Sequence, residues 1–254
     1  VWAPAGGNLA VHLGGGLSVL DSAGTVVAQI DDAARPAWSP DGTRLAFARI
    51  RDGKGVPMIR SLTASEEVTL APDIEPQENP FPFAWSPNGT TVVYGDGLHN
   101  LESGAAAALP GIAVGFSPDG RLLMVVLPED PAVSGRSAHL LDMSRDAMPI
   151  IGLEIRPAPD NTPPWHFIQK WIAWTPDGRV LAYMDPDEFR PRVRVYDTVE
   201  VRQTPYRDIR GEFPNFAPDG KNIAFAFSGK VWVLAIDGSA LADIAQGSAP
   251  QWQP

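Results

Sequence analysis

Three carboxylates lie within four residues of one another, and carboxylate oxygens are the ligands that hard cations such as Ca²⁺ prefer. They are Asp185, Asp187 and Glu188, and the cationic residues Arg190, Arg192 and Arg194 follow them. The spacing lacks the glycine and the distal glutamate of a calcium loop. We therefore predict a solvated, charge-paired hairpin without a metal. Its candidate partner-binding residues are Asp185, Asp187, Arg190 and Arg192.

Two further segments are candidates for binding. Arg49, Arg51 and Lys54 form a small basic cluster in the loop predicted from Arg49 to Val56. A proline-rich insert at 156–167 ends in Trp165, His166 and Phe167. Stiff prolines beside aromatic rings can form a recognition surface with a low ordering entropy. The alternative is a soluble turn in the first case and an aromatic lid on a neighbouring sheet in the second.

Sequence motifs of catalysis are missing. The chain has no Gly-x-Ser-x-Gly elbow, no His-Glu-x-x-His and no glycine-rich phosphate loop. With no cysteine, thiol nucleophiles and cysteine-based zinc sites are excluded. The four histidines, His12, His99, His139 and His166, show no spacing that suggests a shared metal site. We expect no catalytic residues, no metal and no cofactor.

The elements that must position these residues follow from a repeated phrase, aromatic-Ser-Pro-Asp-Gly, which an apolar run follows. Its copies are Trp38-Ser-Pro40-Asp41-Gly42, Trp85-Ser-Pro87-Asn-Gly89, Phe116-Ser-Pro118-Asp119-Gly120, Trp174-Thr-Pro176-Asp177-Gly178 and Phe216-Ala-Pro218-Asp219-Gly220. A degenerate copy begins at Trp2, near the start of the sequence, and a truncated copy begins at Trp252, near its end. The seven motif prolines lie about 42 residues apart on average, which is the length of a four-stranded propeller blade.

Each motif residue has a physical role in a turn between two strands. Proline fixes φ at the first central position of the turn, Asp suits the next, and glycine supplies a positive φ. We expect the motif aspartates to form local hydrogen bonds and the motif aromatics to pack. No stretch shows a sustained helical period, and the one candidate helical turn is Ala105–Ala108. The fold class is therefore all-β.

The phrase resembles the TolB-type β-propeller repeat and lacks the Gly-His and Trp-Asp signatures of the WD type. The resemblance covers essentially the whole chain. It implies a propeller of four-stranded antiparallel blades. In the TolB family such a propeller belongs to a periplasmic protein that binds protein partners, and related propellers occur in prolyl and dipeptidyl peptidases and in an oligogalacturonate lyase. From this resemblance we expect a periplasmic or extracellular bacterial protein.

Six intervals between motifs predict one domain, 1–254, with six blades. The expected bounds are 1–35 with 248–254, 36–82, 83–112, 113–170, 171–212 and 213–247. In this model Ser248–Gln253 supplies the inner strand of the first blade, so pairing of the termini closes the ring and removes a sheet edge. The alternative is a truncated propeller of seven blades.

Length variation predicts where a partner binds. Turns between first and second strands are short, whereas second-to-third loops and connections between blades vary. Loops on a rigid scaffold commonly carry binding. We therefore expect a non-catalytic scaffold that binds a protein or peptide through the long-loop face and the channel mouth. The alternative is the propeller domain of a hydrolase or lyase acting on peptides or carbohydrate.

Charge narrows the class of partner. Asp and Glu number 30 against 20 Lys and Arg, a formal charge of −10, which argues against nucleic acid. The apolar runs are too short to span a bilayer. We expect a monomer without a membrane span.

Overall fold

The computed structural model describes residues 1–70, 83–127, 138–145, 148, 150–155, 172–185, 192–200, 202–203, 209–248, 250 and 252. These residues form antiparallel sheets. Among them there is no helix long and apolar enough to span a membrane. The chain divides into two compact units, Val1–Gly115 and Phe116–Pro254. Each unit is described by itself.

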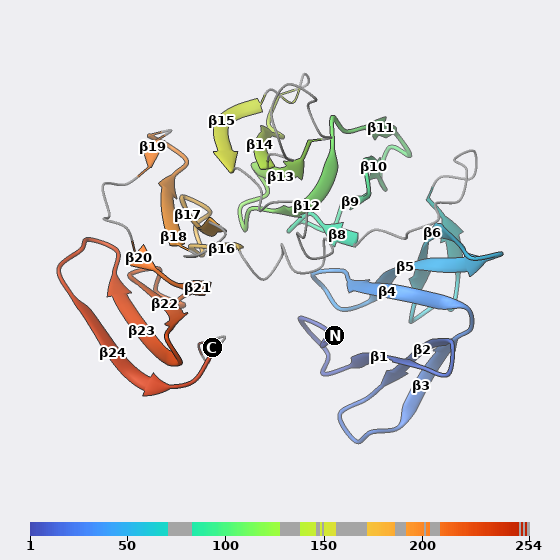
Figure 1. Ribbon diagram of the computed structural model, residues 1–254. Helices are drawn as coiled ribbons and strands as arrows, with labels where there is room; N and C mark the ends of the chain where they lie inside the picture. Colours follow the sequence, from blue (N-terminus) through green and yellow to red (C-terminus); the bar gives the residue numbers. More distant parts are fainter. Residues whose placement is uncertain are drawn as a thin grey trace. The chain divides into compact units, whose positions relative to one another are not determined.

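The first unit begins with three sheets whose strands follow one another in sequence order (Figure 1). The strands are β1 (Leu9–Leu13), β2 (Gly16–Leu20) and β3 (Val26–Ile30), then β4 (Ala33–Trp38), β5 (Arg44–Arg51), β6 (Lys54–Ser61) and β7 (Glu67–Thr69), then β8 (Phe83–Trp85), β9 (Thr91–Tyr94), β10 (Gly97–Asn100) and β11 (Ala106–Ala108).

The remaining strands form three further sheets. They are β12 (Ile112–Phe116), β13 (Leu122–Val126), β14 (Ala138–Asp142) and β15 (Ile150–Ile155), then β16 (Ile172–Trp174), β17 (Val180–Asp185), β18 (Arg192–Asp197), β19 (Arg202–Gln203) and β20 (Ile209–Arg210), then β21 (Glu212–Phe216), β22 (Asn222–Phe227), β23 (Lys230–Ala235) and β24 (Leu241–Gln246). Both β19 and β20 pair with β18.

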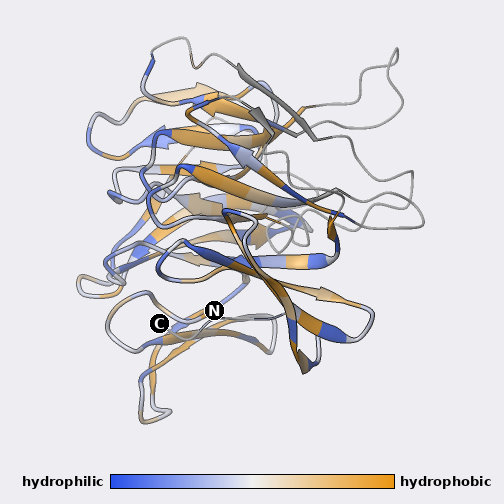
Figure 2. Ribbon diagram, turned by 90° about the vertical axis from the view of Figure 1, so that its left-hand side faces the viewer, coloured by the Kyte–Doolittle hydropathy of each residue, from blue (hydrophilic) through white to orange (hydrophobic). Residues whose placement is uncertain are grey.

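Apolar side chains on both faces of the sheets hold neighbouring sheets together within each unit. Phe47 at the centre of β5 is fully buried between its own sheet and the first sheet. Phe225 occupies the corresponding place in β22 and packs in a cluster with β17 and β18. Figure 2 shows hydrophobic residues concentrated along the strands. Losing such a ring from a core costs about 3–5 kcal/mol.

Both phenylalanines face a bulge in the inner strand of their sheet. The register shifts between Ala34 and Ala37 in β4, and between Glu212 and Asn215 in β21. Arg35 and Phe213 lie at these shifts with φ of 58° and 53°. Each precedes a proline, which has no N–H to lose from the ladder. The bulges therefore recur at the same place in the repeat.

Two sequence expectations about local structure were wrong. Ala105–Ala108 was named as the one segment that could form a helical turn, but Ala106–Ala108 forms β11, because pairing with β10 outweighs the helix preference of alanine. The loop expected from Arg49 to Val56 is mostly strand. Only Asp52 and Gly53 form the turn, with φ of 51° and 78°, the backbone that an Asp-Gly hairpin adopts.

The predicted pairing of the chain termini is not found among the described residues. Val1–Ala3 lie beside β1 instead, with Ala3 donating to the carbonyl of Asn8 and Ala10 donating to the carbonyl of Val1. The position that was predicted for Ser248–Gln253 is therefore occupied by the first three residues.

Candidate interaction surface

The two ends of each sheet differ. One end of each sheet carries the aromatic-Ser-Pro-Asp-Gly turn and the turn between the third and fourth strands. We call it the motif-turn end. The opposite end, with the second-to-third turns and the links between sheets, is the connection end. Consecutive strands are antiparallel, so this division holds within every sheet.

Side chains at the motif-turn end bond to their own turns. The Asp41 carboxylate accepts hydrogen bonds from the hydroxyl of Ser39 at 2.5 Å and from the N–H of Thr43 at 3.0 Å. These bonds, led by the one from Ser39, lower the pKa of Asp41 to about 2. Asn88 accepts the corresponding bonds through Oδ1 in its own copy. The motif carboxylates are thus occupied by local hydrogen bonds.

Backbone groups at this end are also paired. In five of the sheets, the residue after the third strand donates its N–H to the carbonyl of the residue that follows the motif glycine, at 2.8–3.0 Å. These pairs are Leu62 and Thr43, Leu101 and Thr90, Met143 and Arg121, Thr198 and Arg179, and Ile236 and Lys221. Each motif turn is therefore fixed to the adjacent turn of its own sheet.

Motif glycines bring successive turns into contact. A Cβ on Gly178 would lie 2.8 Å from Cγ of Asp119 in the preceding motif. A Cβ on Gly42 would overlap the carbonyl of Ala5, again in the preceding motif. Both glycines have a φ of 70°. Glycine is required here both for its backbone conformation and for this close approach.

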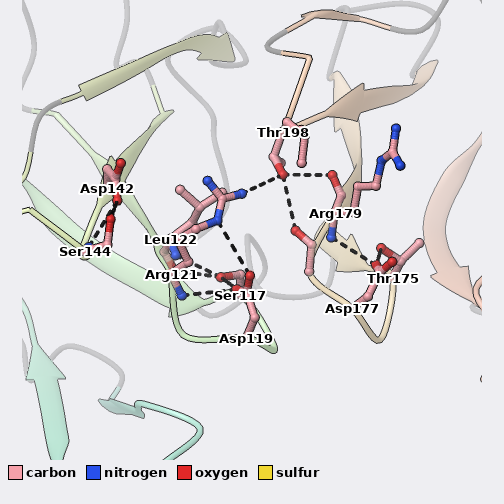
Figure 3. Close-up of polar contacts among 12 residues, drawn as sticks. Ser117, Asp119, Arg121, Leu122, Asp142, Ser144, Thr175, Asp177, Arg179 and Thr198 are labelled. Atoms are coloured by element: carbon pink, nitrogen blue, oxygen red, sulfur yellow. Dashed lines mark hydrogen bonds and ion pairs between the residues drawn. The ribbon is translucent and has the colours of Figure 1, made fainter.

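At the motif-turn end of the second unit, a hydrogen bond joins the fourth and fifth sheets (Figure 3), and an ion pair lies within the fifth sheet. Arg121 donates to the Thr198 hydroxyl at 3.1 Å, and Arg179 donates to the Asp197 carboxylate at 3.0 Å. Burial opposes ionisation of Asp197, but the N–H groups of Glu200 and Val199 and the charge of Arg179 lower its pKa overall. Polar groups here are used internally and leave few for a partner.

The motif tryptophans also bind neighbouring sheets. In three motif copies the indole Nε1 donates a hydrogen bond of 2.9–3.0 Å to a backbone carbonyl of the preceding copy. The accepting residue is the one just before the aromatic of that copy. These bonds run from Trp38 to Val1, from Trp85 to Ala37 and from Trp252 to Asn215. In these three copies the motif tryptophan is thus a hydrogen-bond donor as well as a packing group, a role that the sequence pattern alone did not reveal.

The basic cluster predicted in the second sheet lies at the connection end, but its members differ. Arg49 is a strand residue that pairs with Glu67 and contacts the ring of Phe47, so its charge is balanced within the sheet. Arg51 is exposed and stands opposite Lys54 in the hairpin register. Of the three predicted residues, Arg51 is therefore the exposed one, and Lys54 is partly buried.

At the connection end of the fifth sheet, β17, β18 and β20 place three charged residues in one row. Arg192 is opposite Asp185 on one side and opposite Arg210 on the other. Arg210 was not among the predicted residues, because its pairing with β18 crosses 18 positions of sequence. Arg194 lies on the same sheet face as Arg192, two residues further along β18.

Several predicted residues lie outside the described part of the chain. These are Trp165, His166, Phe167, Asp187 and Arg190.

Residues suited to general acid–base chemistry do not converge within the described ranges. No group of three His, Asp or Glu residues there is arranged to hold a metal ion. The buried phenols of Tyr94 and Tyr196 have raised pKa values, caused first by burial and then by the neighbouring Asp96 and Asp197. Both phenols are therefore neutral near pH 7.

Solved structures share this arrangement of sheets. The chain is similar to TolB from Acinetobacter baumannii, with 14% identity and a TM-score of 0.51, over 92% of this chain and 60% of TolB. It is similar to a chain of the mitotic checkpoint complex, with 14% identity and a TM-score of 0.62, over 98% of this chain and 76% of that one. The fold is that of a β-propeller.

A third similar structure is an enzyme. Porphyromonas gingivalis dipeptidyl peptidase 4 matches with 11% identity and a TM-score of 0.66, over 97% of this chain and 46% of the peptidase. The chain therefore spans about half of the peptidase and less than two thirds of TolB. No family model and no curated protein matches the sequence.

Proposed function

We propose that this propeller is a non-catalytic scaffold that binds a protein or peptide partner through its connection end, as TolB-type propellers do. The observation that supports this most is the wide variation in the length of the links at the connection end, although backbone groups are bonded within the protein at both ends. At the motif-turn end, turn carboxylates, backbone groups and arginines bond to their own or neighbouring sheets. At the connection end, the links between strands range from two residues at Asp52-Gly53 to the long segment at 156–171.

The complete binding surface in this proposal is a ring of six blades with the partner at the mouth of its channel. Trp252, in the last of the seven motif copies, supports this arrangement. Its indole bonds to the carbonyl of Asn215 in the same way as the indoles of Trp38 and Trp85 bond to the preceding copy. The predicted aromatics Trp165, His166 and Phe167, and the predicted charges Asp187 and Arg190, belong to this proposed surface. We further propose a periplasmic or extracellular location, from the likeness to TolB, and a monomeric state.

A photo-crosslinking comparison tests the proposal. Benzoyl-phenylalanine is introduced at Arg51 or Ser228, which are exposed at the connection end, and at Thr43 or Lys221, which are exposed at the motif-turn end. Each pair lies within one unit, so the controls are matched. Irradiation with the envelope fraction of the source organism should give crosslinked bands from Arg51 or Ser228 only. Equal or stronger crosslinking from Thr43 and Lys221 contradicts the proposal.

The alternative is a propeller that accompanies a hydrolase or lyase domain. The likeness to dipeptidyl peptidase 4 supports this reading, since the chain spans less than half of that enzyme. A catalytic domain encoded in the same gene would favour this alternative.

A further inference from the structure

The motif turn of the third sheet carries an asparagine, Asn88, where four other copies carry an aspartate. Asn88 is exposed and is followed by Gly89. An Asn-Gly pair is prone to deamidation, because glycine has no Cβ to hinder attack by its backbone nitrogen. That nitrogen bonds to Cγ of the asparagine, and its proton leaves with the side-chain amino group as ammonia. Water then opens the cyclic imide to aspartate or isoaspartate.

The closed turn holds the two reacting atoms apart. Gly89 donates its N–H to the carbonyl of Ser86 at 2.8 Å, and the φ of Asn88 is negative, which together indicate a type I turn. The third residue of such a turn has a ψ of about 0°, so the next nitrogen eclipses that residue's own nitrogen. Ring closure requires the next nitrogen to eclipse Cβ instead. The reaction therefore requires the turn to open.

Three donors hold the side chain of Asn88 in the closed turn. Its Oδ1 accepts hydrogen bonds from the Ser86 hydroxyl at 2.7 Å, from the Thr90 hydroxyl at 2.9 Å and from the Thr90 N–H at 3.1 Å. Asp41 accepts the same three bonds in its own turn, at 2.5, 2.9 and 3.0 Å. An aspartate at position 88 would therefore find its hydrogen-bond partners already in place.

We propose that Asn88 is a deamidation site that the closed motif turn restrains and whose aspartate product the turn accepts. The inference is independent of the proposed function. Aspartate at position 88 matches the other copies and adds one negative charge at the motif-turn end. Isoaspartate inserts Cβ into the main chain, which lengthens the turn and disturbs the bond from Gly89 to Ser86. The two products therefore differ in their effect on the third sheet.

The rate of deamidation at Asn88 tests the restraint. Peptide mapping by mass spectrometry follows the reaction in mildly alkaline buffer, with and without urea, and oxygen-18 water marks the residues that react during the incubation. The folded wild type should react more than about tenfold slower than the unfolded chain, because opening the turn breaks several hydrogen bonds. Equal rates in the two states overturn the inference.

Ser86→Ala loosens the turn and leaves the Asn-Gly pair intact. The Ser86 hydroxyl bonds to Asn88 and to the main chain of Thr91. The variant should fold, because the sixth sheet already carries Ala217 at this position and its turn is closed by a bond of 2.8 Å from Gly220. Deamidation of the folded variant should be about tenfold faster than in the wild type. An unchanged rate contradicts restraint by this turn.

Ser117→Ala is the matched control in the fourth sheet. The Ser117 hydroxyl makes the same bonds there, to Asp119 at 2.5 Å and to the main chain of Leu122 (Figure 3). Its loss should leave the rate at Asn88 unchanged. Equal acceleration by the two variants would mean that global unfolding controls the reaction, and it would overturn the inference.

Asn88→Asp tests whether the turn accepts the product. The variant should melt at the same temperature as the wild type or higher near neutral pH, because the aspartate accepts the bonds that Asp41 accepts. Differential scanning calorimetry measures the change. A clearly lower melting temperature would contradict acceptance of the product, whatever the rates show.

Discussion

The indole Nε1 of Trp85 donates a hydrogen bond of 3.0 Å to the backbone carbonyl of Ala37, 48 residues earlier in the chain. Ala37 directly precedes the aromatic of the preceding motif, and Trp38 makes the same bond to Val1. Each bond joins the inner strands of two neighbouring sheets. The motif that looks local in sequence therefore also connects one repeat to the next.

Replacing Trp85 with Phe should test this connection. Phe keeps an aromatic ring but has no N–H, so the carbonyl of Ala37 loses its donor. We expect the free energy of unfolding to fall by about 1–3 kcal/mol. Urea titration followed by circular dichroism measures the change. A variant as stable as the wild type would show that the indole acts by packing alone.

Trp252 and Trp2 form a matched pair of motif tryptophans near the ends of the chain. Trp252 is half-buried and bonds to Asn215, whereas Trp2 is 65% exposed. Trp252→Ala should lower the melting temperature by several degrees, at about 2–4 °C per kcal/mol lost in a domain of this size. Trp2→Ala should change it little. Equal effects, or a larger effect at Trp2, would contradict the role given to Trp252.

Alanine substitutions at Gly42 and Gly53 distinguish the cost of a strained backbone from the cost of a steric overlap with a neighbouring turn. Both have a positive φ, but a Cβ on Gly53 meets no atom within 4 Å, whereas one on Gly42 overlaps Ala5. Gly53→Ala should cost about 1–2 kcal/mol from backbone strain. Gly42→Ala should cost about 2–5 kcal/mol, because the preceding turn must also move. Chemical denaturation of both variants checks this order, and similar losses would mean that the turns are not in firm contact.

Asp41 predicts how stability depends on pH. Its folded pKa of about 2 lies below the unfolded value of about 3.9, so the folded state favours the ionised form. The resulting stabilisation is present above about pH 4 and is lost as the pH falls towards 2. Asp41→Asn keeps the Oδ1 acceptor, as Asn88 does in its own turn. The unfolding free energy of this variant should therefore fall less steeply between pH 4 and 2. A slope identical to that of the wild type would contradict the assignment.

The repeated turns and the strands that follow them were predictable from sequence, because proline, aspartate and glycine act on their own turn. The apolar runs at Leu45, Val92 and Leu122 each lie in a strand. The sequence analysis assigned Arg49 and Arg51 to a loop because they are charged, whereas both belong to β5. The Asp52-Gly53 pair is a typical hairpin turn and would have predicted the strand end correctly.

Long-range relationships were not predictable. The bond from Trp85 to Ala37 depends on how two sheets pack. The pairing of Arg210 with Arg192 depends on strand register rather than on local propensity. Arg192 was named as a candidate for its charge and stays a prediction, whereas the position of Arg210 beside it follows only from the strand pairing.

The most direct test of the central claim is amide hydrogen exchange of the wild-type protein with and without the partner that crosslinks to it. Partner binding should slow exchange at the connection end, at residues 51–54, 192–193, 209–210 and 228–229. Exchange at the motif turns, residues 40–43, 118–121 and 218–221, should stay unchanged. Protection confined to the motif turns, or protection at neither end, would contradict the account.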